Sequence, residues 1–303
     1  MTKRLVDLET LTRRGLIGRA AALAGGALLG EAASKVARAA DASPEKPAKP
    51  RLSACIEMLY TQLPFNERPA AVKKAGLPAF EFWGLGGKDL EALSRTSRDL
   101  GLEIAACVAD VGGPLVAEGS AERIVEPMKA SIKAAKTLGT KRMIVTVGNE
   151  IRGVERAVQH DRIVAAMKAA APQVEDADVT LVIEPLNTRV NHKGYYLWSS
   201  DEGFQIVDEV GSPRVKLLFD IYHQQIMEGD LARRITGNLA KVGHLHVADN
   251  PGRHEPGTGE IDYAFLFRTI TSAGYNGFFG LEFSPTGSPD DALKSVKAMA
   301  GLT

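Results

Sequence analysis

The chain of 303 residues contains only two cysteines and has no net charge, with 37 basic and 37 acidic residues. Two cysteines cannot form a disulfide framework, so a hydrophobic core must stabilise the fold. Cys55 and Cys107 fall in two separate apolar segments and are expected to be buried thiols. The balanced charge lacks the basic excess of a nucleic-acid-binding protein. No apolar run approaches the roughly 20 residues that cross a bilayer.

The first forty residues differ in composition from the rest and resemble an export signal. Basic residues precede a short apolar run at 20–30, and small residues follow at 37–40. Arg13 and Arg14 resemble the pair recognised by the twin-arginine export machinery, although a general secretory signal with two chance arginines is the alternative. We therefore expect residues 1–40 to be a twin-arginine signal peptide. The mature protein would be periplasmic or exported, and the export machinery would be a partner.

Residues 41–51 (DASPEKPAKPR) are rich in proline and charge and predict an exposed tether before a catalytic domain over residues 52–303. Removing residues 1–40 takes away seven basic and three acidic residues, which leaves a net charge of −4. This acidic balance disfavours an enzyme that cleaves nucleic acid, because such an enzyme needs a basic groove. We expect a small-molecule substrate and no nucleic-acid partner, and the sequence leaves a homo-oligomer open.

Short apolar segments alternate with amphipathic segments eight times along the remaining chain. The predicted strands cover residues 52–59, 79–83, 103–109, 142–147, 180–186, 215–223, 242–249 and 278–283. The predicted helices cover residues 66–75, 88–100, 121–138, 154–174, 200–210, 230–241, 262–273 and 289–300. Continuous apolar strands between helices predict a parallel sheet covered on both faces. Eight such units in about 250 residues predict an α/β fold with a single (β/α)8 TIM barrel, with an open doubly wound sheet as the alternative.

Ionisable residues stand at the C-terminal ends of the last four predicted strands, where the active site of a TIM barrel lies. These residues are Glu184, Asp220, His246 and Glu282. A buried carboxylate is costly without a partner, so packing alone does not explain the same arrangement on four strands. Two glutamates, an aspartate and a histidine predict a site for a hard divalent ion. Mn²⁺, Mg²⁺ and Co²⁺ suit such a site best, and Zn²⁺ is a further candidate.

Two other histidines lie near this group in the sequence. His244 shares a strand face with His246, one layer deeper, and is expected to be a hydrogen-bonded core residue. His223 follows Asp220 by three residues and is expected to enter a loop. This offset suits contact with a substrate better than another metal bond.

Three stretches resemble the hydroxypyruvate isomerase family, which belongs to the xylose isomerase-like barrels. They are Glu184-Pro-Leu-Asn187, Phe219-Asp220-Ile-Tyr-His223 and residues 244–261, and within the last of these 249–261 is the most specific. The resemblance runs over residues 52–300. It implies a metal-dependent aldose–ketose isomerase that interconverts hydroxypyruvate and tartronate semialdehyde.

The resemblance also implies roles for individual residues. Glu184 and Glu282 would donate and accept the proton, and together with Asp220 and His246 they would hold the metal. His223 and Arg253 would bind substrate oxygens. An arginine can pair with a substrate carboxylate through two hydrogen bonds, which favours a keto acid over a plain sugar. The family resemblance leaves open the roles of Glu57, Glu81, His254 and Glu260.

Two alternative functions remain open from the sequence. A ketose epimerase or isomerase for a larger carbohydrate would use the same metal site. His246 is the residue that ketose 3-epimerases carry at this place, whereas the closer hydroxypyruvate isomerases carry glutamine. A non-catalytic barrel that binds carbohydrate through a metal is the second alternative, but a binder does not need both Glu184 and Glu282. Deuterium exchange at the substrate carbon distinguishes an enzyme from a binder.

Overall fold

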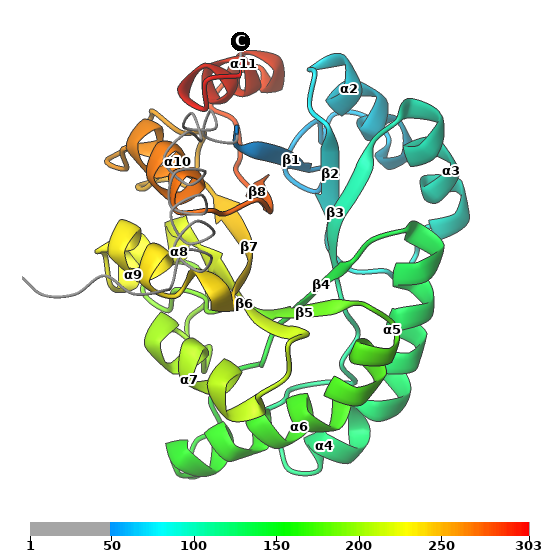
Figure 1. The fold of residues 1–303 in the computed structure, drawn as a ribbon, viewed down its shortest axis with the longest axis vertical. Coiled ribbons are helices and arrows are strands. Elements are labelled where there is room, and N and C mark those ends of the chain that lie inside the picture. Colours follow the sequence, from blue (N-terminus) through cyan, green and yellow to red (C-terminus); the bar gives the residue numbers. More distant parts are fainter. Residues whose placement is uncertain (1–48, 303) are drawn as a thin grey trace, which may run out of the picture. The chain divides into compact units, whose positions relative to one another are not determined.

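The computed structural model describes residues 49–302, in which eight parallel strands form a closed barrel in sequence order (Figure 1). Each strand pairs with the next, and β8 pairs with β1 to close the barrel. The predicted TIM barrel is therefore confirmed, and the open sheet is wrong. The strands are β1 (Arg51–Cys55), β2 (Ala79–Phe82), β3 (Glu103–Val108), β4 (Arg142–Val145), β5 (Thr180–Ile183), β6 (Val215–Asp220), β7 (Val242–Val247) and β8 (Phe278–Leu281).

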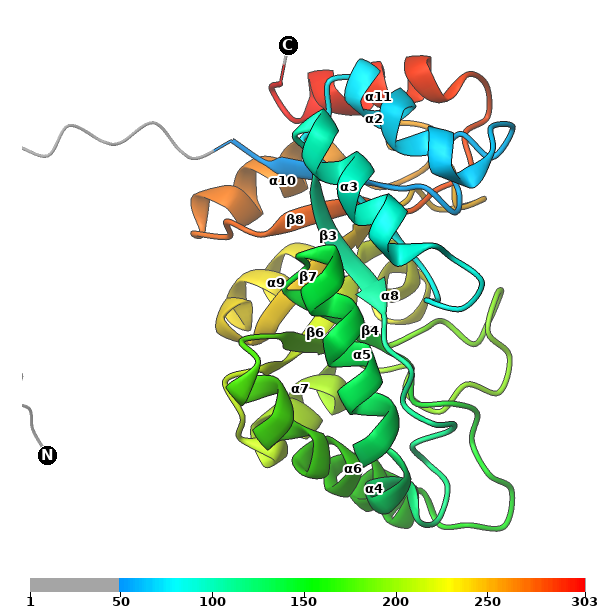
Figure 2. The same ribbon diagram turned by 90° about the vertical axis from the view of Figure 1, so that its right-hand side faces the viewer.

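Helices surround the strands on the outside of the barrel (Figures 1 and 2). Local signals set their ends: Asp89 caps α3 by accepting a hydrogen bond from the Ala92 amide, and Gly101 ends α3 in the left-handed conformation, with φ of 61°. The helices are η1 (Phe65–Glu67), α2 (Arg68–Lys74), α3 (Leu90–Leu100), α4 (Ser120–Arg123), α5 (Val125–Leu138), α6 (Arg156–Asp176), α7 (Ser200–Val210), α8 (Ile221–Met227), α9 (Leu231–Gly237), η2 (Leu239–Lys241), α10 (Tyr263–Ser272) and α11 (Pro289–Met299).

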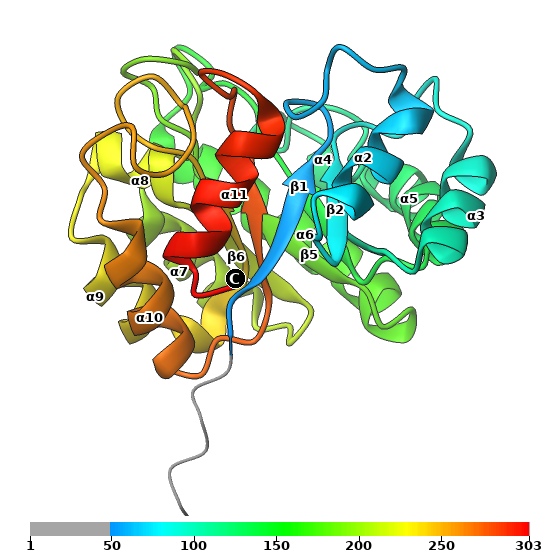
Figure 3. The ribbon, with the colours of Figure 1, turned by 90° about the horizontal axis from the view of Figure 1, so that it is seen from above.

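The loops that follow the strands gather at one end of the barrel, opposite the start of β1 (Figure 3). Below these loops, part of the barrel is filled by an apolar cluster from β3 to β6. The cluster consists of Ala106, Ile144, Val182 and Leu218. Leu218 pairs with His244 across β6 and β7, where buried polar side chains begin. The site is therefore built on a packed layer, apolar on one side and polar on the other.

The sequence analysis missed one helix, α8, which directly follows β6. The predicted strand extended to His223 because Ile221 and Tyr222 continue the apolar run. The strand ends instead at Asp220, whose carboxylate accepts a hydrogen bond from the His223 amide at 3.0 Å and caps the helix. His223 therefore lies in the first turn of a helix, close above Asp220, and not in a loop as expected.

The predicted export signal at residues 1–40 lies outside the described residues, as does the predicted tether up to residue 48. β1 begins at Arg51, one residue before the predicted start of the domain. Within residues 49–302, no helix combines the length and hydrophobicity needed to cross a membrane. Both cysteines are buried and unpaired, as expected.

Candidate metal and active site

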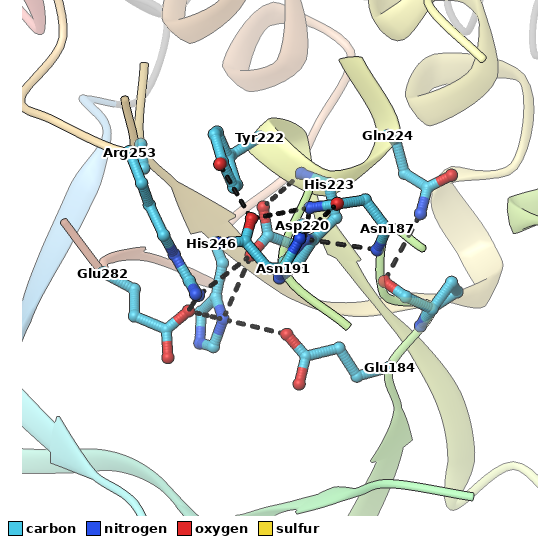
Figure 4. A network of polar contacts seen from close by, with 12 residues as sticks. Glu184, Asn187, Asn191, Asp220, Tyr222, His223, Gln224, His246, Arg253 and Glu282 are labelled. Carbon is cyan, nitrogen blue, oxygen red and sulfur yellow. Dashed lines mark hydrogen bonds and ion pairs between the residues drawn. The ribbon is translucent and has the colours of Figure 1, made fainter. Parts of the chain in front are cut away.

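The four predicted metal ligands come together at the C-terminal end of the barrel (Figure 4). Asp220 and His246 lie on β6 and β7, and Glu184 and Glu282 immediately follow β5 and β8. Each offers a ligand atom within 4.8 Å of the others, and all four side chains are buried. Parallel strands of a closed barrel bring these side chains to one point although they lie far apart in the sequence.

Three carboxylates surround Nδ1 of His246. This nitrogen lies 3.2 Å from Oε2 of Glu282, 3.4 Å from Oε1 of Glu184 and 3.9 Å from Oδ2 of Asp220. It has no hydrogen-bonding partner within the described residues. Buried anionic oxygens around an unpartnered imidazole nitrogen fit a divalent ion, because a cation would satisfy both the charges and the free nitrogen.

The two glutamates have opposite electrostatic environments. Burial raises the pKa of Glu184 to about 7, and the nearby charges of Glu282 and Asp220 contribute. Burial would also raise the pKa of Glu282, but the attraction of His246 and Arg253 outweighs it and holds this pKa well below its usual range. In the same cluster, burial opposes the charged form of His246, but the carboxylates of Glu282 and Glu81 raise its pKa well above the usual value.

His223 points an unpartnered ring nitrogen toward this group. Its Nδ1 lies 2.6 Å from Nδ2 of Asn187, which can donate only, so Nδ1 is the acceptor and Nε2 carries the hydrogen. Nε2 lies 3.5 Å from Oδ2 of Asp220 and has no hydrogen bond among residues 49–302. Burial lowers the pKa of His223 to about 4, so the ring is neutral near pH 7. It can donate a hydrogen bond to a substrate oxygen, and Asn187 orients it, a role that the sequence analysis did not assign.

Arg253 reaches the site from the loop between β7 and α10, as predicted. Its Nη2 donates a hydrogen bond to Oε2 of Glu282 at 2.5 Å and lies 3.9 Å from Oδ2 of Asp220. Its φ of 58° places it in the left-handed region. The loop is fixed by Asp249, whose carboxylate accepts hydrogen bonds from three backbone amides. Arg253 is thus held at the edge of the site by a loop that is hydrogen-bonded to Asp249.

Two further residues contact the site, although the sequence left their roles open. The indole of Trp83, which is 41% exposed, donates a hydrogen bond from Nε1 to Oε1 of Glu282 at 2.7 Å. Glu81 is buried and contacts both histidines of β7. Burial would raise the pKa of Glu81, but the charges of His244 and His246 lower it to about 2. The position of Glu81 between Phe80 and Phe82 was the available signal, because strand alternation points it into the barrel.

The remaining polar residues noted in the sequence stabilise the structure around the site. His244 is fully buried, with Nε2 3.0 Å from Oε2 of Glu81, so the expectation of a hydrogen-bonded core histidine is confirmed. Glu57 pairs with Lys88. In the loop after β7, Nδ1 of His254 contacts the Ser284 carbonyl, and Glu260 accepts hydrogen bonds from Asn250 and Gln225.

Comparisons of the sequence with a family model and with curated proteins agree on the family of this chain. The family model described as "Xylose isomerase-like TIM barrel" matches residues 69–301. Hydroxypyruvate isomerase of Escherichia coli is 32% identical over 251 residues, which cover 80% of this chain and 97% of that protein. The 2-oxo-tetronate isomerase of Cupriavidus necator is 33% identical over 263 residues, which cover 83% of this chain and 99% of that protein.

Among solved structures, a family 2 AP endonuclease from Brucella melitensis superposes with a TM-score of 0.78 at 27% identity, covering 82% of this chain and 98% of that chain. An L-ribulose 3-epimerase superposes with a TM-score of 0.71 at 23% identity, covering 84% of this chain and 94% of that chain. The second likeness concerns the fold alone.

Proposed function

Since the chain belongs to the hydroxypyruvate isomerase family of xylose isomerase-like TIM barrels and is an isomerase, we propose that it interconverts hydroxypyruvate and tartronate semialdehyde in a metal-dependent reaction. The observation that carries this proposal is the meeting of Glu184 and Glu282 at one imidazole nitrogen, beside an arginine. Glu184, Asp220, His246 and Glu282 would hold the ion.

The reaction moves one proton from C3 of hydroxypyruvate to C2 and shifts a hydroxyl proton between the neighbouring oxygens, with no net loss of electrons. A bound divalent ion supplies Lewis-acid stabilisation of the negative charge that develops on these oxygens. Glu282 stays ionised, so it can accept a proton in the reaction, although its lowered pKa makes it the weaker base of the pair. Glu184 can hold a proton near pH 7 and suits its return.

Substrate oxygens would be bound by His223 and Arg253. The neutral His223 donates from Nε2, which faces Asp220. The guanidinium of Arg253 can pair with a carboxylate through two parallel hydrogen bonds. The Arg253 pairing favours a substrate that carries a carboxylate beside its carbonyl, as hydroxypyruvate does, whereas His223 can donate to any substrate oxygen.

A larger keto acid is the second candidate substrate. The relative named 2-oxo-tetronate isomerase is as similar to this chain as the hydroxypyruvate isomerase. Arg253 supports either acid over an uncharged ketose, whose epimerisation is the remaining alternative. A non-catalytic, metal-dependent carbohydrate binder would not need two glutamates with unequal pKa values.

A substrate panel tests the proposal. The metal-loaded chain is incubated in D2O with hydroxypyruvate, 2-oxo-tetronate and an uncharged ketose, and both product and deuterium at carbon are measured. The proposal expects turnover and exchange with a keto acid. Exchange and turnover with the ketose alone would replace it with sugar epimerisation or isomerisation, and no exchange with any substrate would favour a binder.

We also propose that the chain is exported by the twin-arginine route to the periplasm or beyond. Arg13 and Arg14, the short apolar run and the small residues that follow support this proposal. That route carries folded proteins, so the barrel would acquire its metal before export.

A further inference from the structure

Glu81 reaches across the barrel. It lies on β2, yet its carboxylate contacts two histidines on β7, with β1 and β8 between these strands in the sheet. Oε2 accepts a hydrogen bond from Ser53 at 2.6 Å and lies 3.0 Å from Nε2 of His244. Oε1 lies 2.9 Å from Nε2 of His246. The side chain is 2% exposed, so every one of these contacts forms inside the barrel.

The two intervening strands leave room for this carboxylate. β1 carries the small Ser53, and the position that pairs with it on β8 is Gly280, which also pairs with His246. A Cβ atom at Gly280 would lie 2.7 Å from Oε2 of Glu81 and 2.8 Å from its Cδ, too close for either atom to stay in place. The φ angle at Gly280 is not in the left-handed region, so backbone conformation does not require glycine there. The requirement is space for Glu81.

We propose that Glu81 is a positioning residue that anchors Nε2 of His246, so that Nδ1 of the same ring faces the metal site. The proposal rests on the metal site of the proposed function. The two ring nitrogens point to different partners: Nε2 to Glu81, and Nδ1 to the carboxylates of Glu184 and Glu282. Neither nitrogen forms a hydrogen bond within the described residues, so the 2.9 Å approach of Nε2 to Glu81 is an ion pair.

This arrangement has a direct physical consequence for metal binding. A carboxylate paired with one ring nitrogen favours one orientation of the ring and leaves the lone pair of the other nitrogen free for an ion. Ser53 and His244 hold the opposite oxygen of Glu81, so the carboxylate itself is fixed. Loss of such an anchor typically weakens metal binding about 10- to 100-fold.

The same contacts raise a competing arrangement, because Glu81, His244 and His246 also lie close enough together to hold an ion of their own. Oε2 of Glu81 already accepts from Ser53, and His246 would have to serve two ions at once. The positioning role needs only one ion per chain, and the stoichiometry of binding distinguishes the two arrangements.

The test measures Mn²⁺ binding to the metal-stripped full chain by titration calorimetry. Glu81→Gln weakens the anchor while it keeps the size of the side chain, and Gly280→Ala displaces the Glu81 carboxylate without removing any ionisable group. Matched controls are Glu103→Gln, at an exposed ion pair with Arg51, and Gly237→Ala, where an added Cβ meets no atom within 4 Å. Visible absorption of the Co²⁺-loaded chain reports the ligand set independently of activity.

The positioning role predicts one Mn²⁺ per wild-type chain. It also predicts affinity about 10- to 100-fold lower in Glu81→Gln and Gly280→Ala, an altered Co²⁺ spectrum in both, and no change in the controls. Wild-type affinity and spectrum in both variants would overturn the role while the metal site stood. Two ions per wild-type chain, with one lost in Glu81→Gln, would overturn it in favour of a second site. A wild-type chain that binds none of Mn²⁺, Mg²⁺ or Co²⁺ would overturn the metal site of the proposed function and this inference with it.

Discussion

Glu184 and Glu282 approach the same atom, Nδ1 of His246, at 3.4 and 3.2 Å. Their other contacts differ, because Trp83 and Arg253 donate hydrogen bonds to Glu282 and not to Glu184. Two carboxylates of the same residue type therefore have unequal proton affinities at one site. This inequality lets one carboxylate stay ionised while the other exchanges a proton near neutral pH.

Replacement of either glutamate by glutamine keeps its size but removes its ability to exchange a proton. We expect Glu184→Gln and Glu282→Gln to form folded barrels in which turnover of hydroxypyruvate falls about 100- to 10,000-fold. Turnover and deuterium exchange at the substrate carbon are measured together with thermal unfolding. Glu91→Gln, at a largely exposed glutamate on α3, is the matched control. Wild-type turnover in either site variant would contradict the assigned roles.

Arg253 is expected to select substrates that carry a carboxylate. Arg253→Lys keeps the positive charge beside Glu282 but loses the planar pair of donors. We expect kcat/KM for keto acids to fall about 10- to 100-fold, the range of a charged hydrogen bond, and to fall less for an uncharged ketose. Steady-state kinetics on both substrate classes give the comparison. An equal loss on both classes would mean that Arg253 acts through Glu282 alone.

Metal affinity should depend on pH through Glu184. In the metal-free chain its pKa is about 7, so the carboxyl is protonated below that value and must release the proton to bind an ion. The apparent affinity for Mn²⁺ should therefore fall by about tenfold or more per pH unit below about pH 7. His246, whose pKa is also raised, adds to this dependence.

Titration of the chain with Mn²⁺ between about pH 5.5 and 8 measures this slope. In Glu184→Gln the contribution of one proton should disappear, and the slope should become shallower by about one log unit per pH unit. An affinity that does not change over this range would contradict the raised pKa of Glu184.

The export signal is tested in cells. Replacement of Arg13 and Arg14 together by lysine should leave the full-length chain inside the cytoplasm of a bacterium with a twin-arginine system. Fractionation followed by immunoblotting measures the distribution. Export of the double variant at the wild-type level would contradict the twin-arginine route and favour a general secretory signal.

The fold and the metal cluster could be predicted because both follow from the repeated pattern of apolar strands and the residues at their ends. Each apolar run that ends in a carboxylate or histidine places that side chain at the C-terminal end of the barrel, and closure of the barrel brings the four ends together. His244 could be predicted to be a hydrogen-bonded core residue because it lies two residues before His246 on the same strand and shares its face.

Other features depend on capping and side-chain contacts, which periodicity does not encode. Ile221 and Tyr222 continue an apolar run, so only the capping hydrogen bond from the His223 amide to Asp220 reveals that a helix starts there. Glu81 could be placed inside the barrel by alternation, but its partner on β7 depends on the small residues of β1 and β8 that lie between.

The central claim is that one divalent ion, held by Glu184, Asp220, His246 and Glu282, is required for isomerisation of a keto acid. The most direct measurement is hydroxypyruvate turnover by the chain after exhaustive chelation, and again after addition of one equivalent of Mn²⁺, Mg²⁺ or Co²⁺. We expect no turnover in the stripped chain, recovery with one equivalent of at least one of these ions, and a higher Tm in the loaded chain because the ion binds only the folded state. Undiminished turnover after chelation would contradict the claim.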